Sequence, residues 1–323
     1  MFRKIITAAA VLSLAASSLA GCSAPVKDSG KLDVVCTIYP IYDWTCQLAD
    51  ADDANITYLM TSGADLHSYQ PTADDIMKIS SCDVFVYVGG ESDNWVDGAL
   101  KNARNKDMKV VDLMDVLGSD LREEELKEGM QADEQEEEGE DEDEIEYDEH
   151  IWLSLRNAEK CVTAIADELA EADSAHADSY KNNCTAYCDK LTDLDSQYRE
   201  MVGSAKTKTL IFGDRFPFRY LVDDYGLDYY AAFIGCSAES EASFETITFL
   251  ANKCDELGAE YIFTIDGSNC NIANAIVSNT KTKSQKVLTL NSMQTIKMTD
   301  DKKPAGYCEL MTDNLNTLKE ALN

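Results

Sequence analysis

The feature that most constrains the fold is a repeated alternation of short apolar runs with longer segments of helical character. The first half of the chain contains four such runs, at residues 32–38, 56–60, 84–88 and 109–113. The second half contains four more, at residues 209–213, 227–233, 261–265 and 286–290. Strands that alternate with helices form parallel sheets covered on both faces. The sequence therefore predicts an α/β fold with two lobes, each a mainly parallel four-stranded sheet flanked by helices.

A long helical pattern lies between the two halves, with apolar residues recurring every three or four positions. The apolar stripe consists of Tyr180, Cys184, Tyr187, Leu191, Leu194, Tyr198 and Met201. Such a stripe covers ~35 Å of helix. We expect one rigid helix at residues 176–203 to join an N-terminal lobe at 32–175 to a C-terminal lobe at 204–323. His176, at the polar start of this helix, is expected to be an exposed surface histidine.

Residues 1–22 have the organisation of an export signal. Arg3 and Lys4 precede an apolar core that is too short to span a bilayer, and the segment ends Leu-Ala-Gly-Cys22. This ending resembles the bacterial lipoprotein box, which implies cleavage before Cys22 and lipidation of its sulfur; a secretory peptide with a free cysteine is the alternative. We expect an extracytoplasmic protein anchored to the cell membrane through Cys22, with residues 23–31 as a flexible tether.

The net charge of −32 opposes binding to nucleic acid or to an anionic membrane surface. Seventeen acidic residues and only two basic ones lie at residues 122–149, so this stretch is predicted to be a disordered loop. It is either a solvated insertion or a weak collector of cations. The ten cysteines after Cys22 are widely scattered, and we expect buried thiols or a few disulfides.

Two of the three histidines occupy positions typical of ligands. His67 lies in the loop after the second predicted strand, and the carboxyl ends of parallel strands are where ligands collect. His150 ends the acidic tract, directly before an apolar run. We predict that both bind one metal ion, although histidines that are merely hydrogen-bonded in loops would give the same pattern.

Two predicted strands of the second lobe end at carboxylates, Asp214 and Asp266. With His67 and His150 they would form a four-ligand pocket between the lobes. Imidazole suits zinc, copper, iron or nickel, and added carboxylates admit manganese. Each aspartate also precedes a predicted helix, so a role as a helix cap is the alternative.

Several motifs together resemble those of the zinc/manganese solute-binding lipoproteins of ABC importers. They are Gly-Ala-Asp-Leu-His-Ser-Tyr-Gln-Pro at 63–71, Asp-Glu-His-Ile-Trp-Leu at 148–153, the long helix, and Phe-Arg-Tyr-Leu at 218–221 followed by Tyr-Gly-Leu at 225–227. The resemblance covers essentially the whole mature chain. It implies that His67 and His150 bind metal.

The resemblance also implies two further ligands. The family's third ligand, a histidine or glutamate, stands just before the 218–221 segment. An ungapped count from Tyr220 falls on Arg215, which cannot bind a cation, so Asp214 is predicted instead. The fourth ligand is an acid at a strand end of the second lobe, which Asp266 matches.

The resemblance implies a monomeric substrate-binding component, not an enzyme. It would capture a divalent ion, zinc or alternatively manganese, and deliver it to a membrane permease with its ATPase subunit. A surface adhesin is another alternative. A lipid-anchored metallohydrolase is disfavoured, because the sequence contains no His-Glu-x-x-His helix and no Gly-x-Ser-x-Gly elbow.

Overall fold

The computed structural model describes residues 30–132, 146–237, 241–299 and 304–323. Cys22, the export signal and residues 133–145 of the acidic tract lie outside these ranges. Contacts group residues 32–323 into one unit, and the fold given below is that of this unit.

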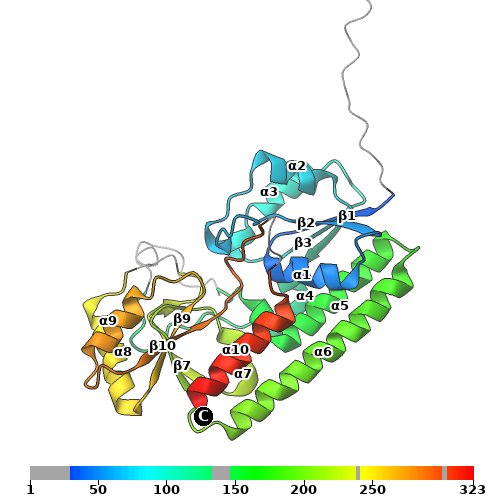
Figure 1. Ribbon diagram of the computed structural model, residues 1–323. Helices are drawn as coiled ribbons and strands as arrows, with labels where there is room; N and C mark the ends of the chain where they lie inside the picture. The colour runs from blue at the N-terminus through cyan, green and yellow to red at the C-terminus, as the bar shows by residue number, and fades with distance from the viewer. Residues whose placement is uncertain (1–29, 133–145, 238–240, 300–303) are drawn as a thin grey trace, which may run out of the picture. The chain divides into compact units, whose positions relative to one another are not determined.

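The first half is built on a parallel sheet with strand order β2-β1-β3-β4 (Figure 1). Its strands are β1 (Leu32–Cys36), β2 (Ala54–Tyr58), β3 (Val84–Tyr87) and β4 (Lys109–Asp112). Its helices are α1 (Tyr39–Leu48), α2 (Ala73–Ser81), α3 (Val96–Lys101) and α4 (Leu113–Leu117). Short 3₁₀ turns lie at Leu66–Ser68, Glu91–Asp93, Gly118–Asp120 and Ile151–Leu153. The apolar β3 is central and buried from Val84 to Val86, because helices cover both faces of a parallel sheet.

The second half contains two parallel strand pairs, joined by a single bridge between Phe212 and Phe263. The pairs are β5 (Thr209–Ile211) with β7 (Asp228–Tyr230), and β9 (Tyr261–Ile265) with β10 (Lys286–Leu290). A further parallel pair is formed by β6 (Arg215–Phe216) and β8 (Phe233–Ile234). The helices are α7 (Arg219–Tyr225), α8 (Phe244–Leu257), α9 (Asn271–Asn279) and α10 (Tyr307–Leu322). The α/β class is confirmed, and the strand expected at 227–233 is split into β7 and β8.

The long helix α6 (Ala177–Ser204) packs along α5 (Leu155–Ala172) and also contacts α1 and α10 (Figure 1). All seven residues of the predicted apolar stripe are buried, so the 3.6-residue period identified the packed face correctly. His176 lies immediately before α6 and its side chain is 43% exposed. Its ring nitrogens face Asp173 at 2.6 Å and Asp53 at 3.4 Å.

The residues that follow His150 connect distant parts of the chain. The indole Nε1 of Trp152 donates to the carbonyl of Ser292 at 2.8 Å, and the hydroxyl of Tyr307 donates to the carbonyl of Trp152 at 2.6 Å. Both aromatic side chains are almost completely buried. These bonds hold the turn after His150 against the loop that follows β10 and against the start of α10.

The described ends of the acidic tract are paired with each other, unlike the disordered loop predicted for residues 122–149. The amide of Glu124 donates to the carbonyl of Glu146, and the amide of Asp148 donates to the carbonyl of Arg122, both at 2.9 Å. Backbone pairing needs no apolar side chains, so the composition of the tract did not reveal it. This pairing fixes the segment that leads into His150.

None of the ten cysteines within the described ranges forms a disulfide. In those same ranges, no helix is both long and apolar enough to cross a membrane.

A buried carboxylate fixes the loop after β3. One oxygen of Asp93 accepts the amides of Val88 at 3.0 Å and Gly89 at 3.1 Å, while the other oxygen is buried without a partner. Gly89 and Gly90 have positive φ angles, and a Cβ at Gly90 would collide with the carboxylate of Glu149. Burial raises the pKa of Asp93 to about 7, with a further contribution from Glu149.

We predict that Asp93→Asn changes how stability depends on pH. An unfolded chain loses the Asp93 proton near pH 4, whereas the folded chain keeps it up to about pH 7. The wild type should therefore lose stability relative to the variant as pH rises through this window, by up to about 1.4 kcal/mol per pH unit. Urea unfolding between pH 4 and 8 measures the difference. Asp97→Asn, the same change on an exposed side chain, is the control, and parallel profiles for wild type and Asp93→Asn would contradict the prediction.

Candidate metal centre

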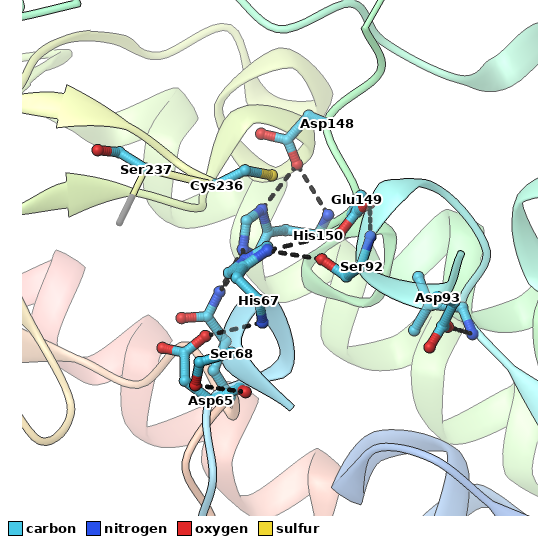
Figure 2. A network of polar contacts seen from close by, with 12 residues as sticks. Asp65, His67, Ser68, Ser92, Asp93, Asp148, Glu149, His150, Cys236 and Ser237 are labelled. Atoms are coloured by element: carbon cyan, nitrogen blue, oxygen red, sulfur yellow. Dashed lines mark hydrogen bonds and ion pairs between the residues drawn. The ribbon is translucent and has the colours of Figure 1, made fainter. Parts of the chain in front are cut away.

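His67 lies on the 3₁₀ turn that follows β2 (Figure 2). The turn is capped by Asp65, whose carboxylate accepts the His67 amide at 3.1 Å. The ring Nδ1 faces the hydroxyl of Ser92 at 2.8 Å and the carboxylate of Glu149 at 3.5 Å. Glu149 in turn accepts the Ser92 amide at 2.9 Å. These contacts turn Nε2 of His67 away from the loop.

His150 is completely buried. One oxygen of Asp148 accepts the His150 amide at 2.8 Å and lies 3.0 Å from its Nδ1. The ring also packs against Gly235, where an added Cβ would come within 3.0 Å of two ring atoms. A larger residue at 235 would push the ring out of place.

The two rings direct their Nε2 atoms at each other across 3.1 Å. Each Nδ1 faces oxygen acceptors, so the hydrogen of a neutral ring lies on Nδ1 and a lone pair lies on Nε2. Burial, and then the neighbouring ring of His150, lower the pKa of His67 to about 3, so this ring is neutral at ordinary pH. Two lone pairs that converge in this way can bind one cation.

Gln294 fills the space beside this pair, and the sequence did not single it out. Its side-chain nitrogen lies 3.3 Å from Nε2 of His67 and is in hydrogen-bond contact with Nε2 of His150. One amide group with two N–H donors can satisfy both lone pairs. Gln294 follows the end of β10 closely, so the rule that ligands collect at strand ends could have found it.

Cys236 is the second residue that the sequence did not single out. Its sulfur and the ligand nitrogens of His67 and His150 all lie within 4.8 Å of one another. Figure 2 shows the thiol directed toward His150 and Asp148. Cys236 directly follows the glycine after β8, the same kind of strand-end position as His67.

Arg215 lies next to these groups as a fixed cation. Its guanidinium donates to Asp65 at 2.7 Å and to the carbonyl of Ser237 at 3.2 Å. Burial opposes ionisation of Asp65, but the charge and hydrogen bond of Arg215 outweigh it and lower the pKa of that carboxyl. Arg215 therefore ties the His67 loop to the Cys236 loop.

Asp214 and Asp266 line a cavity of about 400 Å³ together with His67 and Arg215. Neither carboxylate belongs to the cluster of His67, His150 and Cys236. Asp214 accepts the amide of Arg215 at 2.9 Å. Both aspartates thus share a cavity with one predicted histidine ligand, and their assignment as ligands stays a prediction.

Asp266 also has a bracing role. One of its oxygens accepts the amide and hydroxyl of Ser292 at 2.5 and 2.7 Å, and the other accepts the hydroxyl of Thr295 at 3.0 Å. These bonds hold the segment that carries Gln294.

Comparisons with known proteins identify relatives of this chain. The chain is 31% identical over 312 residues to the zinc-binding lipoprotein AdcA of Streptococcus pneumoniae, which covers 95% of the chain and 59% of that protein. The chain therefore spans little more than half the length of such relatives. It is 30% identical to the high-affinity zinc uptake system protein ZnuA of Bacillus subtilis, over 100% of the chain and 99% of that protein.

The fold also matches a solved structure, the Zn(II)-bound ZnuA-like domain of Streptococcus pneumoniae AdcA, with a TM-score of 0.70 and 29% sequence identity. The match covers 91% of this chain and 99% of that domain. Residues 34–321 match the ZnuA family, described as zinc-uptake complex component A, periplasmic. This match takes in nearly every element from β1 to α10, and the chain belongs to the ZnuA family.

Proposed function

We propose that this protein captures a divalent transition-metal ion outside the cytoplasmic membrane, zinc in the first place, and delivers it to the permease of an ABC importer. The observation that carries the proposal is the buried pair of His67 and His150, whose Nε2 atoms are 3.1 Å apart. Two imidazole nitrogens on one tetrahedral zinc ion lie about 3.3 Å apart, given bonds of about 2.0 Å. The two imidazole rings therefore need almost no rearrangement to accept the ion.

The surrounding carboxylates support the same proposal. Asp148 and Glu149 face the outer nitrogens of the two rings, as the outer partners of metal-bound histidines usually do. Asp214 and Asp266 line the cavity that reaches His67, and we propose that they favour the entry of a cation and complete its coordination. Manganese is the alternative cargo, since carboxylates suit it better than imidazoles do.

The remaining parts of the proposal concern the cellular setting. The relatives include zinc-binding lipoproteins and a zinc uptake protein, which supports anchoring through Cys22 and a permease partner. We propose a monomer whose two lobes, at residues 32–175 and 204–323, are linked by the helix at 176–203 and enclose the ion. A buried site closed by protein ligands suits transport better than hydrolysis, which needs an open coordination position.

The first test is the double variant His67→Ala, His150→Ala. It should weaken zinc binding by more than about 100-fold, because losing even an outer partner of a metal ligand costs 10- to 100-fold. Competition with a chelator of known zinc affinity measures the loss, and circular dichroism checks that the fold is kept. His176→Ala removes the exposed third histidine and should leave zinc affinity unchanged. Unchanged affinity in the double variant would overturn the site, and a protein that binds no metal tightly would favour the adhesin alternative.

A second test addresses the outer partner of His150. Asp148→Asn keeps the size of the side chain but removes the charge opposite Nδ1, so zinc affinity should fall about tenfold. The matched control is Asp52→Asn, which makes the same change in net charge at an exposed position. Equal affinities for the two variants would show that the contact with Asp148 does not support metal binding.

A further inference from the structure

We propose that Cys236 supplies a thiolate ligand to the ion held by His67 and His150, which makes the centre selective for zinc over manganese. This inference rests on the proposed capture of a divalent metal. It departs from the set of two histidines and two carboxylates that the sequence predicts. The sulfur of Cys236 and one ring nitrogen of each histidine lie within 4.8 Å of one another. Among the described residues, no other group of three or more histidine, cysteine or acidic side chains is arranged in this way to hold a metal ion.

The distances suit one small ion. A thiolate sulfur and an imidazole nitrogen on a tetrahedral zinc ion are about 3.5 Å apart, given bonds of about 2.3 and 2.0 Å. The sulfur of Cys236 lies within 4.8 Å of a ring nitrogen of each histidine, so a modest shift of its side chain would bring it to bonding distance of one ion.

The backbone around Cys236 is held in place from three directions. Gly235 packs against the ring of His150, and the carbonyl of Ser237 accepts from Arg215 at 3.2 Å. The amide of Cys236 itself donates to the carboxylate of Glu124 at 3.3 Å. A thiol fixed in this manner next to two imidazoles is preorganised for coordination.

Acidic side chains surround the thiol of Cys236. Burial raises the pKa of Cys236 well above its ordinary value, and the nearby Glu124, Asp148 and Glu149 add to the effect. A bound divalent ion reverses this, because a coordinating thiol loses its proton to the solvent as the metal–sulfur bond forms. The same carboxylates that disfavour a free thiolate attract the cation.

The thiolate has a consequence for the choice of metal. Sulfur is a soft ligand that binds zinc well, whereas manganese prefers carboxylate, carbonyl and water oxygens. Arg215 opposes an all-oxygen site, because it already occupies Asp65 and brings a positive charge to the cavity. We therefore expect Cys236 to account for much of the preference for zinc.

X-ray absorption spectroscopy of the zinc-loaded wild type tests the ligand directly, without any variant. We expect one sulfur at about 2.3 Å and nitrogen or oxygen atoms at about 2.0 Å. Loading one equivalent of Co²⁺ should produce a sulfur-to-cobalt charge-transfer band in the near ultraviolet. Cys236→Ser should abolish this band and weaken zinc binding about 100-fold, with a much smaller effect on manganese.

Cys270→Ser is the matched control, since Cys270 is a partly buried free thiol that lies outside the cluster. It should keep the charge-transfer band and the zinc affinity. Tight zinc with only nitrogen and oxygen neighbours, and an unchanged affinity in Cys236→Ser, would overturn the thiolate ligand and leave zinc capture intact. A wild-type protein that binds no zinc tightly would overturn the proposed function and this inference with it.

Discussion

The candidate site depends on the close approach of two buried imidazoles whose Nε2 atoms point at each other. Such an arrangement is unfavourable in isolation, because both Nε2 atoms are acceptors at 3.1 Å. It is held in place from outside by Asp148, Ser92 and Glu149, which fix the Nδ1 sides of the rings. The backbone pairing of the acidic tract places Asp148 and Glu149, and the β3 loop with its glycines places Ser92. The capped turn places His67 itself.

Much of the fold could be predicted from the sequence because burial leaves a periodic signal. The apolar run of β3 and the stripe along α6 each identify an element and its buried face. The second sheet was less predictable. Residues 227–233 form one apolar run, yet the chain bends at Ala232 and divides it into β7 and β8. A bend of this kind depends on tertiary packing, which short apolar windows do not encode.

The candidate site was only partly predictable. His67 and His150 were identified because histidine is rare in this chain and both residues border loops. Cys236 and Gln294 were missed although each follows a strand end, because one thiol among ten scattered cysteines and one glutamine in a loop stand out less than a rare histidine. Their importance arises from β8 and β10 ending beside the histidines, a long-range arrangement that spacing along the chain cannot show. Asp266 was predicted as a ligand from its strand-end position. That position did not reveal that its carboxylate also accepts three hydrogen bonds from Ser292 and Thr295.

The position of Gln294 has a kinetic consequence. Its side-chain nitrogen contacts both Nε2 atoms, so Gln294 competes with a cation for the same two ligand atoms. Any arriving cation has to displace this amide before it can bind. Loading and release of an ion would therefore both involve movement of one buried side chain.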